Sequence, residues 1–173
     1  MRVALGIATA VAAGLISAWA APMPVPVLTA VTTPVVRVSG SPCTTTARAC
    51  VDLTTRRAWL IRNGRIVFGP VPVNIGGPGE LTPMGTFKVW RKDPHHVSVQ
   101  QHGTPMPYSV FFDRGVAFHS GPLELMSAGC VHLRLKDAIT FYNSLRIGDQ
   151  VQVRATRLPH ARPLTRTGVP RSG

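Results

Sequence analysis

The pattern of apolar and polar positions along the middle of the chain is typical of short β-strands. Runs of β-branched and aromatic residues lie at 50–53, 57–61, 65–68, 87–90, 108–112, 115–119 and 150–153. Asn63-Gly64 separates two of these runs, and Asn-Gly is the strongest local signal for a hairpin because both turn residues must adopt positive φ. Asp113-Arg114 is the turn of a second predicted hairpin. The pattern therefore predicts a mainly β domain.

One stretch shows a convincing helical period. Its apolar residues recur at helical spacing and are Leu135, Ala138, Ile139, Tyr142 and Leu145. Asp137 stands in the predicted first turn and Gly148 lies just past the predicted end, as is common at helix termini. We expect this helix to pack on a sheet near residues 127–130.

The two ends of the chain differ in composition from the middle. Residues 1–20 combine Arg2, an apolar run and Ala18-Trp19-Ala20, which predicts a cleaved secretory signal; an uncleaved membrane anchor is the alternative. Residues 21–42, rich in Pro, Val and Thr, are expected to form a linker, with an edge strand at 35–38 as the alternative. Residues 43–154 would form the domain, and 155–173 a basic, disordered tail without acidic residues.

The formal net charge is +12. A balance this basic implies a polyanionic neighbour. Export and the lack of a nucleic-acid-binding motif argue against nucleic acid, which leaves anionic cell-wall polymers or lipid headgroups as the expected surroundings. We expect a secreted or periplasmic protein associated with the cell wall. Its basic tail would bind anionic wall polymers, or would serve only to keep the protein soluble.

A polar segment at 91–107 is expected to be a loop that covers the substrate. It holds His95, His96 and His102, but only Asp93 is a nearby acidic residue, so no metal site is predicted. The glycine-rich stretch 74–87 lacks a Gly-Lys-Ser/Thr ending and is not expected to bind a nucleotide.

Three cysteines are present, and an odd number in an exported protein suggests one disulfide and one free thiol. Cys43 and Cys50 flank a short polar segment, where a disulfide would fix the start of the domain. Cys130 is then the free cysteine. A pairing of Cys130 with one of the other two stays open from the sequence.

Cys130 and His119 are the candidate catalytic residues. His119 ends an apolar, strand-like run, and Cys130 ends the small-residue turn Ser127-Ala128-Gly129-Cys130. Such a turn is expected to expose the sulfur and to leave backbone N–H groups free. A cysteine nucleophile needs a nearby base, since a free thiol titrates near ~8.5. The competing interpretation is a structural cysteine and histidine.

His119-Ser120 and the run from Ser127 to Leu133 resemble the catalytic motif of the L,D-transpeptidase (YkuD-like) family. The stretch 82–87, Thr-Pro-Met-Gly-Thr-Phe, matches the turn before a core strand in that family. The resemblance covers about residues 50–154 and implies a β-sandwich of two packed sheets with one well-defined helix after the catalytic cysteine. Two positions depart from the motif: Ala128 stands where His is frequent, and His132 stands where Arg or Asn is frequent.

The resemblance implies a peptidoglycan L,D-transpeptidase that makes 3-3 cross-links between stem peptides without a cofactor. Cys130 would attack a tetrapeptide stem and release D-Ala, with His119 as its base. Gly129, Ser127 and Ser120 would support the site or the oxyanion. His132, Arg134 and Tyr108 would contact the substrate, and carbapenem-type β-lactams would be covalent inhibitors. The alternative for His132 is that it acts as the base itself, since residues two apart on a strand face the same side.

Three alternatives remain open. The same Cys/His site would serve an L,D-carboxypeptidase or another peptidoglycan hydrolase if water were the acceptor. A non-catalytic wall-binding module would have an unreactive or disulfide-bonded Cys130. A papain-like enzyme is disfavoured because its histidine follows the cysteine, whereas His119 precedes Cys130.

Overall fold

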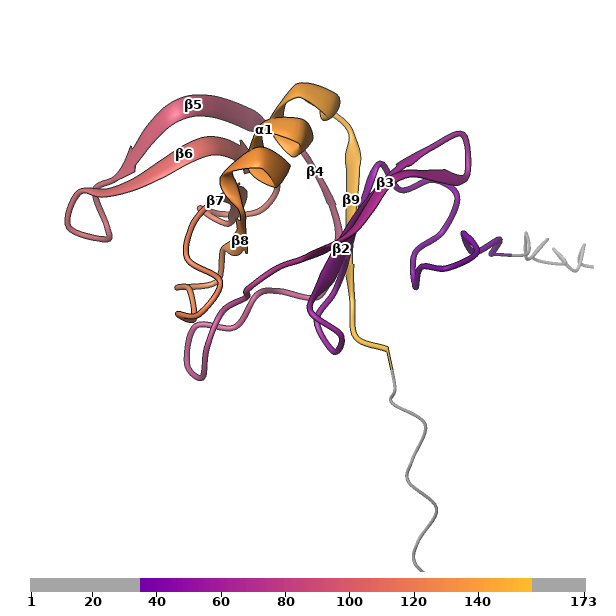
Figure 1. Ribbon diagram of the computed structural model, residues 1–173, viewed down its shortest axis with the longest axis horizontal. Helices are drawn as coiled ribbons and strands as arrows, with labels where there is room; N and C mark the ends of the chain where they lie inside the picture. The colour runs from indigo at the N-terminus through magenta and orange to yellow at the C-terminus, as the bar shows by residue number, and fades with distance from the viewer. Residues whose placement is uncertain (1–34, 157–173) are drawn as a thin grey trace, which may run out of the picture. The chain divides into compact units, whose positions relative to one another are not determined.

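The computed structural model describes residues 35–156 (Figure 1). The predicted signal, most of the predicted linker and nearly all of the predicted tail lie outside the described residues, and the predicted domain boundaries stay a prediction. The elements in chain order are β1 (Ala49–Asp52), β2 (Arg57–Arg62), β3 (Arg65–Pro72), β4 (Gly85–Lys88), β5 (Arg91–Ser98), β6 (Thr104–Phe111), β7 (Ala117–Ser120), β8 (Val131–Leu133), α1 (Leu135–Ser144) and β9 (Gln150–Arg154).

The larger sheet has the strand order β3-β2-β1-β9-β4. The predicted Asn-Gly hairpin is confirmed: β2 and β3 pair antiparallel up to Arg62 and Arg65, and Asn63 and Gly64 have φ of 49° and 72°. β1 pairs in parallel with β9, which follows the helix. The last described strand thus lies inside this sheet, between β1 and β4.

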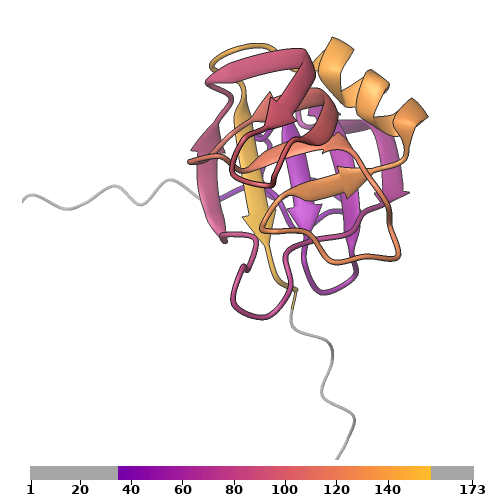
Figure 2. The ribbon, with the colours of Figure 1, turned by 90° about the vertical axis from the view of Figure 1, so that its left-hand side faces the viewer.

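The smaller sheet has the order β5-β6-β7-β8, with β7 and β8 parallel. The two sheets pack around one apolar core (Figure 2). Val51 and Val151 enter this core from the larger sheet, and Val110 and Phe118 enter it from the smaller one. The predicted fold class, mainly β with two packed sheets and one helix, is confirmed for residues 35–156.

α1 confirms the predicted helix and packs on β6 and β7 (Figure 1). Phe141 and Ala138 are its buried apolar residues, whereas Leu135 at its first turn is 55% exposed. Within residues 35–156, no helix has the length and apolar character needed to cross a membrane.

The segment 91–107 is not the polar loop that its composition predicted. Most of it forms β5 and β6, which pair antiparallel from Arg91 with Phe111 to Ser98 with Thr104. β5 is an edge strand, and edge strands tolerate charged residues and a proline such as Pro94 because one side of the backbone needs no partner. The connecting turn is limited to residues 99–103.

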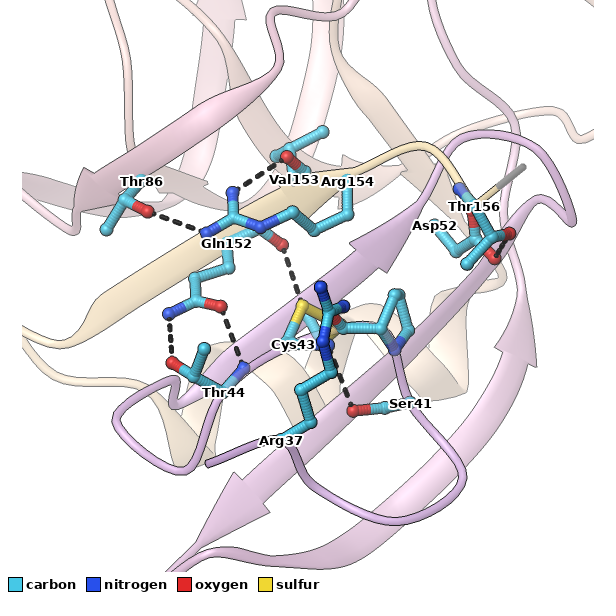
Figure 3. Close-up of a disulfide and its surroundings, with 12 residues drawn as sticks. Arg37, Ser41, Cys43, Thr44, Asp52, Thr86, Gln152, Val153, Arg154 and Thr156 are labelled. Carbon is cyan, nitrogen blue, oxygen red and sulfur yellow. Dashed lines mark hydrogen bonds between the residues drawn. A yellow bond between two sulfur atoms is a disulfide. The ribbon is translucent and has the colours of Figure 1, made fainter. Parts of the chain in front are cut away.

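Cys43 and Cys50 form a disulfide, as predicted (Figure 3). Cys130 is free. The chain before Cys43 folds back against the domain: Arg37 forms a bridge with Thr44, and Val38 is buried beside the disulfide. The disulfide therefore lies in a small second core on the larger sheet, away from β7 and β8.

Candidate active site

Parallel pairing of β7 with β8 brings the two central histidines together. His119 and His132 are register partners, and their ring centroids lie 4.7 Å apart at an interplanar angle of 73°. His119 is buried, and His132 is partly buried. Because Cys130 immediately precedes β8, the same pairing places the cysteine near the strand that carries His119.

The cysteine turn is held by a loop at 74–82. Gly76 forms a bridge with Ser127, and the backbone of Asn74 exchanges hydrogen bonds with that of His132. The buried Thr82 hydroxyl donates to the Gly129 carbonyl oxygen over 2.9 Å and accepts from the Gly76 N–H over 2.9 Å. Thr82 therefore ties the loop to the residue before the cysteine.

Gly129 itself has φ of +97°, a conformation that a residue with a Cβ adopts only with strain. On the other side of the turn, the Ser127 hydroxyl donates to the Cys130 carbonyl. Within residues 35–156, the N–H groups of Ala128, Gly129 and Cys130 have no hydrogen-bond acceptor, as the sequence predicted for the last two.

A cavity of about 310 Å³ opens beside this turn. Cys130, His119 and His132 all line it, together with Ser120 and Ser127. The prediction of an exposed sulfur is wrong. Cys130 is only 8% exposed, and its thiol donates to the Gly115 carbonyl oxygen over 3.7 Å. Met106, Phe111 and Ala117 of the smaller sheet pack around Cys130, which also lines the cavity.

His119 is held in one tautomer. Its Nδ1 lies 2.9 Å from the Ser120 carbonyl oxygen and must donate to it, which leaves Nε2 as the proton acceptor. Burial, reinforced by repulsion from His132, lowers the pKa of His119 to about 4. His119 is therefore neutral and able to accept a proton at neutral pH.

His132 follows the same pattern, with Nδ1 donating to the Pro122 carbonyl oxygen over 2.9 Å. Burial lowers its pKa also. Burial raises the pKa of the Cys130 thiol, and a hydrogen bond from the Ala117 backbone opposes this only in part. The resting site thus holds a neutral thiol beside two neutral imidazoles.

The other predicted substrate contacts lie elsewhere. Tyr108 does not line the cavity and packs edge-to-face on Tyr142 of α1, with ring centroids 5.8 Å apart. Arg134 is the exposed residue that precedes α1 and is also absent from the lining. Of the three predicted substrate contacts, only His132 lines the cavity.

Sequence reasoning missed Thr82 as a site residue, although it singled out the stretch 82–87. That stretch was interpreted as a marker of the fold alone. Among the residues that the structure describes, no three His, Cys, Asp or Glu side chains are grouped so as to hold a metal ion.

Comparisons with known proteins agree with this geometry. A family model described as the L,D-transpeptidase catalytic domain (YkuD) matches residues 46–153. Probable L,D-transpeptidase 3 of Mycobacterium tuberculosis is 31% identical over an aligned stretch of 105 residues, and the alignment covers 49% of this chain and 38% of that protein. The chain thus spans well under half the length of this curated relative.

Among solved structures, an L,D-transpeptidase (Yku) from Stackebrandtia nassauensis has a TM-score of 0.59 and 32% identity, covering 63% of this chain and 55% of that one. L,D-transpeptidase 3 from Mycobacterium tuberculosis, in complex with a faropenem-derived adduct, has a TM-score of 0.57 at 22% identity over 65% of this chain and 61% of that one, a likeness of fold alone. Since the family model matches more than half of its residues, this chain belongs to the YkuD family of L,D-transpeptidase catalytic domains.

Proposed function

We propose that this protein is a cysteine-dependent L,D-transpeptidase that joins peptidoglycan stem peptides through 3-3 cross-links. The observation that carries the proposal is the shared cavity: the free Cys130 and the neutral His119 line it together, in a chain that belongs to this family. No cofactor is needed for the chemistry of these two side chains.

The first half-reaction acylates Cys130. Nε2 of His119 takes the thiol proton as the sulfur attacks the carbonyl carbon between the third residue of the stem and its terminal D-Ala. The tetrahedral intermediate collapses, the C–N bond breaks, and the proton passes from His119 to the leaving D-Ala amine. A thioester on Cys130 remains.

In the second half-reaction an amine is the nucleophile and the Cys130 sulfur is the leaving group. The side-chain amine of the third residue in another stem attacks the thioester carbonyl, and His119 accepts a proton from that amine. The C–S bond breaks, and the proton returns to the sulfur. The products are an amide between two third residues and the regenerated thiol.

In this mechanism the thiol proton moves to His119 at the same time as the sulfur attacks, which is consistent with a neutral thiol and a neutral imidazole before the substrate binds. Because burial raises the pKa of Cys130 and lowers the pKa of His119, a separated thiolate and imidazolium are disfavoured before the substrate binds. A substrate carbonyl provides a place for the developing negative charge, so the proton moves as the new bond forms.

Backbone N–H groups would stabilise that charge. The N–H groups of Gly129 and Cys130 have no acceptor within residues 35–156. Each such donor, when aimed at an oxyanion, contributes about 3 kcal/mol to transition-state stabilisation. Ser127 and Thr82 support them by fixing neighbouring carbonyl groups.

Three further properties belong to the same proposal. Carbapenem-type β-lactams would acylate Cys130, since relatives of this fold are known in complex with imipenem and with a faropenem-derived adduct. The protein would be exported through its signal segment and would act in the cell wall. Its basic tail would bind anionic wall polymers.

The test supplies disaccharide-tetrapeptide fragments to the purified mature protein and identifies the products by mass. We expect D-Ala release together with a 3-3 cross-linked dimer, and neither product with Cys130→Ala. Release of D-Ala with only tripeptide products would show a carboxypeptidase. A native protein that leaves the fragments unchanged would overturn the proposal.

A further inference from the structure

A second cavity, of about 260 Å³, adjoins the candidate active site and is lined largely by residues of the β5–β6 hairpin. Trp90, Arg91, His96 and Gln100 are among its lining residues. It is smaller than the ~300–1,000 Å³ usual for a pocket that encloses a drug-sized molecule. One sugar ring or one side chain is an occupant of suitable size.

Trp90 is an exposed aromatic ring that is nevertheless held in place. The residue is 53% exposed, yet its indole N–H donates to the Asp113 carbonyl oxygen over 3.2 Å. Its ring packs on the buried Phe111 with centroids 5.7 Å apart. Fixing an exposed indole in this way costs side-chain entropy before any ligand binds, which favours binding by preorganisation.

The polar groups around Trp90 favour a neutral ligand. None of the described residues that line the cavity is acidic, so a cationic amine finds no partner carboxylate there. Arg91 is already paired with Asp93 at 2.9 Å, and Asp93 also contacts His96. The guanidinium charge is therefore largely satisfied, while its remaining N–H groups, Ser98 and Gln100 can exchange hydrogen bonds with hydroxyl or acetamido groups.

The second cavity adjoins the first one. Ser98 and Met106 line both cavities. Gly115 lines the second cavity, and its carbonyl oxygen accepts a hydrogen bond from the Cys130 thiol. An extended peptide covers about 3.5 Å per residue, so a sugar lies roughly 10 Å from the third residue of its own stem. Neighbouring cavities that share a wall suit two parts of one such ligand.

We propose that the cavity around Trp90 is a subsite for a neutral N-acetylated hexose of the glycan strand. The apolar C–H face of the sugar stacks on the indole, whose face carries the negative part of the ring quadrupole, and the hydroxyl and acetamido groups bond to the polar rim. This proposal rests on the proposed function, because it names the glycan part of the same substrate.

Direct binding tests the subsite without any need for turnover. Tetra-N-acetylchitotetraose is titrated into the mature protein, with binding followed by calorimetry and by the NMR signal of the Trp90 indole N–H. We expect saturable binding that shifts this signal, a Kd increase of about tenfold or more in Trp90→Ala, and a smaller increase in Trp90→Phe. The matched control is Val67→Ala, an exposed apolar residue on β3 of the larger sheet, which should bind like the native protein.

Three results would overturn the subsite. The first is a native protein with no saturable response at millimolar sugar, and the second is a folded Trp90→Ala that binds the tetrasaccharide unchanged. In the third case the free tetrapeptide, and not the sugar, would shift the Trp90 signal, which would assign the cavity to peptide. Thermal unfolding of each variant identifies any that has lost its fold, and the indole signal of the native protein then decides.

A second experiment links the subsite to catalysis. The ratio of kcat/KM for the disaccharide-tetrapeptide over kcat/KM for the sugar-free tetrapeptide should fall about tenfold in Trp90→Ala. An unchanged ratio contradicts the subsite. If the native protein turned over neither substrate, the proposed function would fail while the sugar titration would still decide the subsite.

Discussion

Two hydroxyl groups fix the peptide units on either side of Cys130. Thr82 binds the Gly129 carbonyl, and Ser127 binds the Cys130 carbonyl. In a trans peptide the C=O and the following N–H point in opposite directions. The hydrogen bond from Thr82 therefore also sets the direction of the Cys130 N–H, one of the two proposed oxyanion donors.

Replacing Thr82 should thus impair acyl transfer without removing a reacting group. Thr82→Val keeps the shape but leaves the Gly76 N–H and the Gly129 carbonyl without their buried partner, at a cost of about 2 kcal/mol in the free energy of unfolding. We expect a fall of about tenfold or more in the rate of Cys130 acylation, measured by stopped-flow with a β-lactam. Thr82→Ser is the control that keeps the hydroxyl and should retain most of the rate; equal rates in all three proteins would contradict this role.

At this scale the sequence identifies the two candidate reacting residues, but it does not identify the residues that hold them in place. Cys130 and His119 stand in a recognisable local motif, whereas Thr82 acts on Gly129 from 47 positions away, which no local pattern reveals. Tyr108 was predicted to contact the substrate, and the structure places it outside the cavity. Its ring packs on Tyr142 of α1. The position of α1 relative to the strands cannot be predicted from the alternation of apolar and polar residues.

At the scale of elements, the loop at 74–82 and the parallel pair β7–β8 together build the site. The loop reaches the cysteine turn through two backbone hydrogen bonds to Ser127, whose carbonyl accepts from the Gly77 N–H and whose N–H donates to the Ile75 carbonyl. The Asn74–His132 bridge adds a second connection. Where Gly76 of the loop approaches Gly129 of the cysteine turn, there is no room for a side chain. A Cβ on Gly76 would meet the Glu80 carbonyl oxygen at 1.9 Å and the Gly129 Cα at 2.8 Å.

Gly76→Ala should therefore displace the loop from the cysteine turn. Because the opposing atoms are backbone, we expect a loss of about 3 kcal/mol or more in the free energy of unfolding and little remaining acylation. Gly79→Ala is the matched control in the same loop: it meets nothing within 4 Å and carries only the strain of φ +86°, about 1 kcal/mol. Urea unfolding compares the two, and similar losses in both would show that the close contact is not what matters.

Elements with local signals are predicted well. The Asn63-Gly64 turn and the helix at 135–144 are specified by neighbouring residues, and the structure confirms both. The strand β5 was missed because an edge strand with Pro94 and several charged residues lacks alternation, and its strand conformation depends on pairing with β6.

For the whole molecule, the buried histidines make stability depend on pH. The pKa of His119 is about 4 in the folded chain and near 6.5 when unfolded, so between these values the unfolded chain binds more protons. Stability therefore rises with pH through this window and is lost as pH falls from 6.5 to 4, by about 3 kcal/mol for His119 alone. His132, whose pKa is also lowered, adds in the same direction.

Asp52 acts at a lower pH. Burial alone would raise its pKa, but hydrogen bonds from Thr156, Thr55 and Thr54 outweigh burial and lower it. Its contribution is present above the unfolded pKa, near 3.8, and is lost as pH falls below that value. The acid loss between pH 6.5 and 4 therefore belongs to the histidines and not to this carboxylate.

Urea unfolding at pH 7, 6 and 5 measures this dependence. We expect the free energy of unfolding to fall steadily over that range in the native protein and to fall less in His119→Gln, which keeps a polar side chain but does not titrate. Equal stability at pH 7 and pH 5 in the native protein would mean that His119 is not buried in its neutral form.

The two-sheet arrangement as a whole was predictable only through family resemblance. Local patterns gave most strands and the helix, but the parallel pairings β1–β9 and β7–β8 join segments far apart in the sequence. It is β7–β8 that sets His119 beside His132, and neither spacing nor composition contains that information.

The measurement that tests the central claim most directly is the intact mass of the mature protein after incubation with a carbapenem. The account predicts one drug-mass adduct on the native protein, no adduct on Cys130→Ala, and acylation slowed roughly a hundredfold or more in His119→Gln. An adduct that persists in Cys130→Ala, or a native protein that stays unmodified while folded, would contradict Cys130 as the activated nucleophile of this site.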